Sequence, residues 1–349
     1  MNILHDTLIN WYDENHRDLP WRHDPTPYQV WLSEVILQQT RVNQGRDYYL
    51  RFIEKWPTVT DLAQATEEAV LKMWQGLGYY SRARNLHHCA KQVVEEYGGE
   101  FPADFEKLRG LKGIGDYTAA AIASIAFNLP HAVVDGNVYR VLSRLYDIDT
   151  PINNNEGQTT FAQLADDLLN REQPGLHNQA MMEFGALHCT PKNPDCLHCP
   201  LQAQCLAFAH QTVMLRPVKL QKTKVTTRYF NYLVIRIKDS IYLHKRSGND
   251  IWKNLYDFPC IESEQHLSVE EIVATAQFQQ LFEGKPFTIT KVSPIFTHKL
   301  THRTILAQFI EIKLDEELLQ IQTKGLILTP ESDLGNYPIP RLIDLYLNT

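Results

Sequence analysis

The chain has 349 residues, of which 44% are hydrophobic and 21% charged, and its net charge is −7. No apolar run approaches the roughly 20 residues that a membrane span needs, and Met1–Trp11 is too polar for a signal peptide. We therefore expect a cytoplasmic protein. The negative charge, concentrated in residues 1–210, argues mildly against nonspecific electrostatic binding of nucleic acid, although it does not exclude a local basic face.

The first part of the chain predicts helices. Thr26-Pro27 is typical of a helix start, with Thr as N-cap and Pro in the first turn, and Val30, Trp31 and Val35 follow at helical spacing. Gly98-Gly99 is a strong stop after a further helical run. The remaining helical periodicities cover residues 62–74, 83–97, 158–169 and 178–187.

Glu34 lies within the helix that is predicted to start at Thr26-Pro27. Three of its four neighbours at helical spacing, Val30, Trp31 and Leu37, are apolar. A carboxyl group in such surroundings loses solvent, so its pKa should rise and it could donate a proton near neutral pH, as a general acid must. The alternative is an ordinary surface glutamate at the edge of an amphipathic helix.

A glycine turn lies between two helical stretches at Leu111–Ala119. Gly113 and Gly115 allow a tight turn whose backbone amides meet the N-terminus of the helix that begins near Tyr117. Such amides form an anion site that requires no net positive charge. The string is the helix-hairpin-helix pattern, which grips one DNA phosphate, and it could anchor DNA on an acidic domain.

Asp135 follows the apolar run Ala132–Val134 and precedes a predicted helix at 138–145. Near a helix N-terminus the dipole favours the charged carboxylate. Asp135 could be a plain N-cap. Its surroundings, however, should push its pKa away from that of Glu34, which is how acid and anion roles are divided in glycosidic-bond cleavage.

Four cysteines follow one another as Cys189, Cys196, Cys199 and Cys205, with the spacing Cys-x6-Cys-x2-Cys-x5-Cys. Paired Cys-x2-Cys knuckles, the usual zinc-ribbon pattern, are absent from this sequence. An iron–sulfur cluster is therefore the favoured interpretation. A structural zinc or unrelated buried thiols stay open as alternatives.

The composition and the hydrophobic periodicity of the sequence change beyond residue 210. Residues 211–228 carry lysines and arginines without an acid, which indicates a basic linker. Strand-like segments at 229–237, 241–245 and 293–312 and a helical one at 269–281 then predict an α+β domain. We expect a mainly α domain over 1–210, the linker over 211–228 and the α+β domain over 229–349.

The ordered motifs resemble the adenine DNA glycosylases, the MutY family of the helix-hairpin-helix superfamily. They are Leu19–Arg22, Trp31–Thr40, Gly76–Asn85, the glycine turn, Val134–Val138 and the four cysteines. The resemblance implies that adenine opposite 8-oxoguanine or guanine in double-stranded DNA is flipped into a pocket and removed. It also implies a [4Fe-4S] cluster on the cysteines that organises a DNA-contacting loop, and we expect a monomer.

The resemblance assigns roles by position. Glu34 would protonate adenine at N7, and Asp135 would stabilise the oxocarbenium-like sugar. The remaining assignments are support of this chemistry (Tyr117, Asn137), contact with adenine (Trp21, Arg22, Glu183) and entry into the base stack beside the lesion (Gln39, Tyr79).

Tyr117 separates this chain from its nearest relatives. Endonuclease III-like enzymes carry there a lysine that forms a Schiff base and drives strand cleavage. With no amine at the position, although Lys112 is near, we expect a monofunctional glycosylase. The alternatives are a bifunctional glycosylase/lyase and a noncatalytic iron–sulfur DNA-binding protein.

The C-terminal region resembles the Nudix-like domain with which these enzymes recognise 8-oxoguanine. Phe296-Thr297-His298 matches the family's Phe-Ser-His-like segment, with Thr in place of Ser. The hydroxyl is kept, so a hydrogen bond to the lesion remains available. The same residues could be ordinary members of a β-hairpin.

Overall fold

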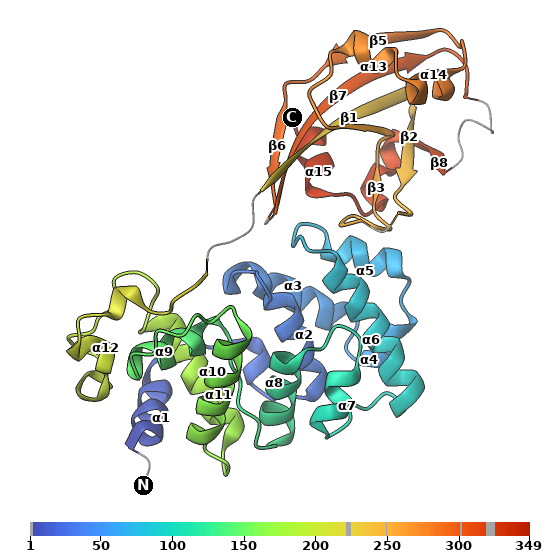
Figure 1. The fold of residues 1–349 in the computed structure, drawn as a ribbon. Helices are drawn as coiled ribbons and strands as arrows, with labels where there is room; N and C mark the ends of the chain where they lie inside the picture. Colours follow the sequence, from blue (N-terminus) through green and yellow to red (C-terminus); the bar gives the residue numbers. More distant parts are fainter. Residues whose placement is uncertain (1–2, 221–224, 249, 301, 319–324) are drawn as a thin grey trace. The chain divides into compact units, whose positions relative to one another are not determined.

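The computed structural model describes residues 3–220, 225–248, 250–300, 302–318 and 325–349. The chain divides into two compact units, drawn in Figure 1: the first unit comprises Met1–Gln64 and Asn85–Gln221, the second Ala65–Arg84 and Lys222–Thr349. The predicted division counted residues 65–84 with the helical domain. The structure groups them with the second unit, and several of their side chains hydrogen-bond to its backbone.

The described residues of the first unit form helices and no strand. The α-helices are α1 (Ile3–Asn15), α2 (Pro27–Leu37), α3 (Val42–Lys55), α4 (Val59–Gln64), α6 (Ser81–Tyr97, which begins in the second unit), α7 (Phe105–Gly110), α8 (Asp116–Phe127), α9 (Gly136–Leu145), α10 (Asn155–Leu168), α11 (Pro174–Leu187) and α12 (Leu206–Ala209). Short 3₁₀ turns are η1 (Pro20–Arg22), η2 (Gln202–Gln204) and η3 (Val213–Leu215). Among the helices that the structure describes, none is long and apolar enough to cross a membrane.

Local chemistry explains where the helices begin. The predicted start of α2 is confirmed: the Thr26 hydroxyl accepts from the Gln29 amide and the Gln29 side chain accepts from the Thr26 amide, a complete capping box. The single helix predicted over 62–74 is wrong. Thr66 caps a new helix, α5 (Glu67–Trp74), by accepting from the Ala69 amide, so the chain breaks between α4 and α5.

Helix α11 packs against α1, α8 and α9 of the first unit. Its glycines allow unusually close approach. A Cβ at Gly175 would lie 2.6 Å from the Ser124 carbonyl oxygen of α8, and one at Gly185 would lie 2.7 Å from the Cβ of Asn137 on α9. The close packing brings the start of α9 against α11, and the apolar core beneath includes Leu8, Phe161 and Phe184.

The predicted hairpin joins α7 to α8. Gly113 has a φ of 80°, which favours glycine, and a Cβ there would lie 2.7 Å from the Cβ of Asn85. Gly115 is the N-cap of α8 and provides no capping side chain. The backbone amides at the start of α8 therefore have no side-chain cap of their own, as a phosphate site requires.

The second unit is built on an eight-stranded sheet, which confirms the predicted α+β class. Its strands are β1 (Thr226–Ile237), β2 (Ser240–Lys245), β3 (Tyr256–Asp257), β4 (Cys260–Ser263), β5 (Phe287–Val292), β6 (Phe296–Lys299), β7 (Arg303–Leu314) and β8 (Leu326–Pro330). The main order is β3-β2-β1-β7-β5, with β4 on β1, β6 on β7 and β8 on β2. Strands β1 and β7 are parallel and the other pairs antiparallel.

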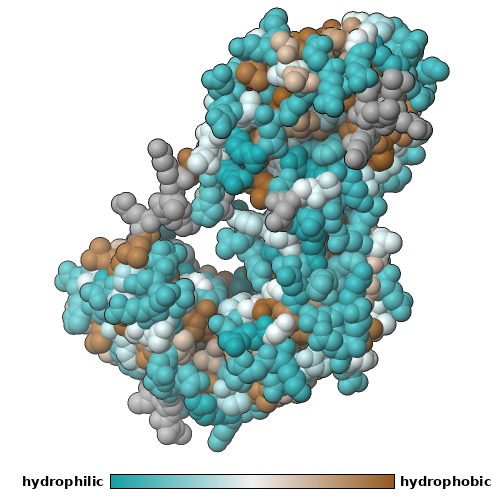
Figure 2. Space-filling view, turned by 45° about the vertical axis from the view of Figure 1, so that its right-hand side comes forward, coloured by the Kyte–Doolittle hydropathy of each residue, from teal (hydrophilic) through white to brown (hydrophobic). Residues whose placement is uncertain are grey.

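Helices accompany this sheet. They are α5, α13 (Val269–Val273), α14 (Ala276–Phe282) and α15 (Arg341–Leu347), with the 3₁₀ turn η4 (Glu331–Asn336). One apolar cluster joins Phe278 and Phe282 of α14 to Ile235 and Ile312 of the central strands. In the view of Figure 2, hydrophilic side chains cover most of the surface and apolar ones form small, scattered patches.

The predicted basic linker is largely structured. The Val218 carbonyl accepts from the Ile152 amide at 3.0 Å, and the Leu220 amide donates to Asn153 at 2.8 Å, so the chain as far as Leu220 is fastened to the first unit. Thr226 already begins β1. Residues 221–224 of the prediction, with Lys222 and Lys224, lie outside the described residues.

Candidate active site

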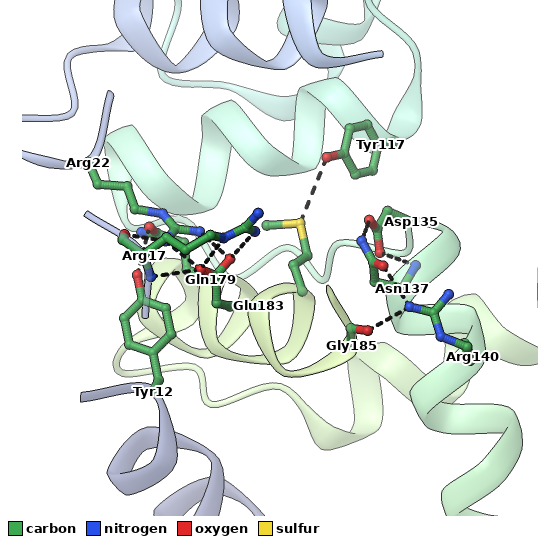
Figure 3. Close-up of polar contacts among 11 residues, drawn as sticks. Tyr12, Arg17, Arg22, Tyr117, Asp135, Asn137, Arg140, Gln179, Glu183 and Gly185 are labelled. Carbon is green, nitrogen blue, oxygen red and sulfur yellow. Dashed lines mark hydrogen bonds and ion pairs between the residues drawn. The ribbon is translucent and has the colours of Figure 1, made fainter. Parts of the chain in front are cut away.

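A cleft of about 410 Å³ opens in the first unit. Its lining brings together all four predicted catalytic residues (Glu34, Tyr117, Asp135, Asn137) and four of the predicted substrate-binding residues (Trp21, Arg22, Gln39, Glu183). Figure 3 shows that two groups of polar contacts face this region, one around Asp135 and one around Glu183. We call Glu34, Tyr117, Asp135 and Asn137 the acid end, and Arg17, Arg22 and Glu183 the ion-pair end.

Glu34 comes from α2 and meets Tyr117 of α8. The Tyr117 hydroxyl donates to Glu34 Oε2 at 2.5 Å and lies 3.8 Å from the Met182 sulfur. Burial, with a smaller contribution from the nearby Asp135 charge, raises the pKa of Glu34 to about 7, although the Tyr117 hydrogen bond opposes the rise. The predicted rise is confirmed, and Glu34 can carry a proton near neutral pH.

Asp135 is the N-cap of α9, as the sequence allowed. Its Oδ1 accepts from the amides of Asn137 and Val138 at 2.8 and 2.7 Å, and its Oδ2 accepts from Asn137 Nδ2 at 2.6 Å. The predicted lowering of its pKa is wrong. Burial raises the pKa of Asp135, and these three hydrogen bonds only reduce the rise, because the carboxylate lies under protein rather than in solvent.

Arg140 holds the Asn137 side chain in place through a hydrogen bond. Its guanidinium donates to Asn137 Oδ1 at 2.8 Å, to the Gly185 carbonyl at 2.6 Å and to the Cys189 carbonyl at 2.7 Å. Figure 3 shows this side chain reaching from α9 toward Asn137 and Gly185. Sequence reasoning missed Arg140, and its position five residues after Asp135 was the only signal available.

The ion-pair end surrounds Glu183, which is 1% exposed. Arg17 Nη2 and Arg22 Nη2 donate to Glu183 Oε2 at 2.6 and 2.9 Å, and the Arg17 backbone amide donates to Oε1 at 2.9 Å. Burial alone would raise the pKa of Glu183, but these donors overcome it and lower the pKa to about 2. Arg17 was not predicted, since no spacing pattern connects it with a residue so distant in sequence.

Two residues predicted to enter the base stack have left-handed backbones. Gln39 (φ 57°) follows α2 and lines the cleft, whereas Tyr79 (φ 47°) belongs to the second unit and is 53% exposed. Positive φ is uncommon for residues with a side chain and marks a constrained turn. Both side chains are therefore presented by tight turns rather than by helix faces.

The predicted recognition segment forms β6. Thr297 pairs with Leu306 of β7 and is exposed, while Phe296 and His298 are partly buried on either side of it. The segment is an edge strand of the sheet, so the ordinary β-structure interpretation describes its backbone correctly. The alternation leaves the Thr297 hydroxyl facing outward, available to a ligand.

The four predicted ligand cysteines line one small cavity. Arg144 and His188 share the lining, and Arg144 Nη1 donates to Cys189 Sγ at 3.4 Å. Within the described part of the chain, no group of three or more His, Cys, Asp or Glu converges as it would on one metal ion. Cys89 and Cys260 lie elsewhere, buried and partly buried, as isolated thiols.

Comparisons with known proteins agree with this site. Residues 32–165 match the HhH-GPD superfamily of base excision DNA repair proteins, and residues 231–349 match the NUDIX domain. The adenine DNA glycosylase of Buchnera aphidicola subsp. Baizongia pistaciae is 34% identical over 311 residues, covering 87% of this chain and 84% of that protein. The chain belongs to the adenine DNA glycosylase family.

The mammalian relatives are matched over less than half of their own length. The Rattus norvegicus protein is 49% identical over 215 residues, which are 59% of this chain but 41% of that protein. The chain thus spans about two fifths of the length of its rodent relative. Among solved structures, a thermostable thymine-DNA glycosylase shares the fold with a TM-score of 0.56 and 28% identity, covering 60% of this chain and 96% of that one.

Proposed function

We propose that the chain hydrolyses the N-glycosidic bond of adenine mispaired with 8-oxoguanine or guanine in double-stranded DNA, as a step of base excision repair. The observation that carries the proposal is the acid end of the cleft. A carboxyl group whose pKa is raised to about 7 faces the same space as a second carboxylate, and the two come from different helices. Two carboxyl groups with separate roles are what glycosidic-bond cleavage uses.

The first step is proton donation. Adenine flipped into the cleft would receive the Glu34 proton at N7, and the glycosidic bond would then break with its electron pair leaving on the base. Protonation makes adenine a neutral leaving group. The Tyr117 hydroxyl, which donates to Glu34 Oε2, would orient the carboxyl group and stabilise the carboxylate that remains.

The second step is stabilisation of the sugar. The oxocarbenium-like ion left at C1′ is positive, and ionised Asp135 would stabilise it electrostatically until water adds. Asn137 and the α9 amides donate to Asp135 and would hold its carboxylate in one orientation. At the other end, Trp21, Arg22 and Glu183 would bound the adenine, with Arg17 holding Glu183.

The reaction should stop at base release. A lyase needs an amine that forms a Schiff base with the sugar, and no lysine is among the described residues that line the cleft. Lys112 is exposed on the hairpin and is not part of that lining. We therefore infer a monofunctional glycosylase.

We also infer a [4Fe-4S] cluster on Cys189, Cys196, Cys199 and Cys205. The four cysteines line one small cavity, and their spacing lacks the paired Cys-x2-Cys knuckles of a zinc ribbon, which favours an iron–sulfur cluster. The cluster would cross-link the loop rather than take part in base cleavage. Gly113 and Gly115 would hold a DNA phosphate, and Thr297 of β6 would read 8-oxoguanine, in a cytoplasmic monomer.

Single-turnover cleavage of a duplex containing A:8-oxoguanine, developed with alkali, tests the proposal. The wild-type protein should give alkali-labile product, and a lack of product would refute it. Asp135→Asn keeps an N-cap side chain but removes the charge, so base release should stop while duplex binding remains. Full activity in that variant would remove Asp135 from the mechanism.

A further inference from the structure

We propose that the second unit, which carries the 8-oxoguanine-reading strand β6, also holds the turn that presents Tyr79, with Tyr80 and Gln75 as positioning residues. The inference rests on the proposed function, in which Thr297 reads the lesion and Tyr79 enters the base stack. It places Thr297, which reads the lesion, and Tyr79, which stacks beside it, in the same structural unit. Opposite-base recognition and stacking at the lesion would then be coupled mechanically.

The turn itself is rigid. Gly76 and Gly78 have φ values of 100° and 72°, and Tyr79 follows with a φ of 47°. The Gly78 carbonyl accepts from Trp74 Nε1 at 3.0 Å and from Arg82 Nη2 at 3.4 Å. The Arg82 guanidinium also lies 5.7 Å from the centre of the Tyr79 ring. Because the turn is held on both sides, a shift of the residues that hold it would also move Tyr79.

The support is Ile339, which lies between two prolines. Its amide donates to Gln75 Oε1 at 3.3 Å, and its carbonyl accepts from the Tyr80 hydroxyl at 3.2 Å. Pro338 and Pro340 have no amide hydrogen, so Ile339 supplies the only backbone donor of this tripeptide. Ile339 is 6% exposed and Tyr80 3%, and both hydrogen bonds therefore lie largely out of solvent, where loss of a partner is most costly.

Further contacts lie on both sides of the turn. Before it, Lys72 Nζ donates to the Tyr337 carbonyl at 3.0 Å and to Gln75 Oε1 at 3.1 Å. After it, Arg84 Nη1 donates to the Lys253 carbonyl at 2.9 Å. Each contact uses a side chain of the 65–84 segment and, apart from the Lys72–Gln75 pair, a backbone carbonyl of the 225–349 part. The segment is thus bound independently of the side chains at 253 and 337.

A continuous path leads from this support to the reading strand. Residue 340 is the N-cap of α15, whose Tyr346 ring stacks on Phe309 at 4.0 Å and lies edge-on to Phe296 of β6 at 6.2 Å. Phe296 immediately precedes Thr297. A shift of β6 on binding 8-oxoguanine would therefore displace α15 and the residues that hold the turn.

The experiment measures stacking by fluorescence. A duplex with 2-aminopurine next to 8-oxoguanine is bound by the protein in the Asp135→Asn background, where adenine stays in place. Entry of Tyr79 into the stack should change the fluorescence, and Tyr79→Ala should abolish the change. Tyr80→Phe, which deletes one hydroxyl and keeps the ring, should weaken the fluorescence-detected binding about fivefold, as the loss of one buried hydrogen bond predicts.

Opposite-base preference supplies the second readout. In the Asp135 wild-type background, Tyr80→Phe should lower the ratio of the A:8-oxoguanine rate to the A:G rate about fivefold, mainly through the A:8-oxoguanine rate. Gln75→Leu should do the same, and Gln75→Glu, which keeps an acceptor for the Ile339 amide, should restore the ratio.

Tyr242→Phe is the matched control. Tyr242 is also 3% exposed and in the second unit, and its hydroxyl accepts from the Leu318 amide, far in sequence from the turn. If it lowers the ratio as much as Tyr80→Phe, or if Tyr80→Phe and Gln75→Leu keep both the ratio and the fluorescence change, the inference is overturned. A wild-type protein that releases no adenine would refute the proposed function alone, because the fluorescence readout needs no base release.

Discussion

The two ends of the cleft each bury a glutamate, and the pKa values of the two glutamates shift in opposite directions. Glu34 and Glu183 both lose solvent, yet the pKa of Glu34 rises to about 7 and that of Glu183 falls to about 2. The difference lies in their partners. Glu34 meets a neutral hydroxyl and a nearby carboxylate, whereas Glu183 meets two guanidinium groups. Counter-ions, rather than burial, therefore decide which glutamate can donate a proton and which serves as a fixed charge.

The largest effect is expected when the residue at position 34 can no longer donate a proton. Glu34→Gln keeps the size of the side chain but cannot supply a proton to N7, so the single-turnover rate on A:8-oxoguanine should fall by about 10²–10⁴-fold. Because burial of the ionised carboxylate is unfavourable, the variant should unfold at equal or higher urea concentration than the wild type. A normal rate would refute the acid role.

Glu183→Gln should have the opposite effect on stability. It leaves Arg17 and Arg22 beside a neutral amide, and breaking a buried ion pair from one side costs about 3 kcal/mol. Urea denaturation at neutral pH should show this loss, with wild type and Glu34→Gln as references. An unchanged midpoint would mean that solvent already screens the two arginines.

A pH profile sharpens the comparison without mutation. Only protonated Glu34 can act, so the base-release rate should fall about tenfold per pH unit as the pH rises above about 7. The raised pKa means that the protonated state of Glu34 stabilises the fold at low pH, and this contribution is lost as the pH passes about 7. Glu183 contributes in the other direction, above its ordinary value of 4.5, and loses its contribution only as the pH falls toward 2. A rate that stays flat from pH 6 to 9 would contradict the assignment.

The smallest effect should come from Arg17→Lys. The lysine keeps one positive charge but loses the forked donation to both Glu183 oxygens. Arg22 remains, and Arg17 is partly exposed, so we expect a loss of only about 1 kcal/mol in unfolding free energy. Retention of stability in Arg17→Lys together with loss in Glu183→Gln would assign the ion-pair end to Arg22.

Much of the site could be predicted because it depends on local rules. Glu34 stood out as an acid among apolar neighbours in a helix, and Asp135 as a residue before a helix start. Arg17 could not be predicted, because its role is to form an ion pair with Glu183, which lies 166 positions away in sequence. The pKa of Asp135 was misjudged for a related reason: the local helix dipole was visible in sequence, but the protein that covers the carboxylate was not.

The fold shows the same division. The helix start at Thr26 and the strand-like composition of residues 229–237 in β1 are properties of neighbouring residues, and both were predicted. The break at Thr66 was missed because Leu62 and Trp74 keep the same apolar periodicity on either side of it. Residues 65–84 belong to the second unit and hydrogen-bond to Ile339 and Lys253, which no local pattern connects with the turn.

The approach of Gly185 to Asn137 bears on how variants of this chain should be judged. At 2.7 Å a single added methyl group would displace Asn137, and with it the hydrogen bond that orients Asp135. Gly185→Ala looks mild by any substitution scale and leaves the helix-forming tendency of α11 higher than before. A harmless-looking change on a structural helix could thus produce a folded protein that has lost its catalytic geometry.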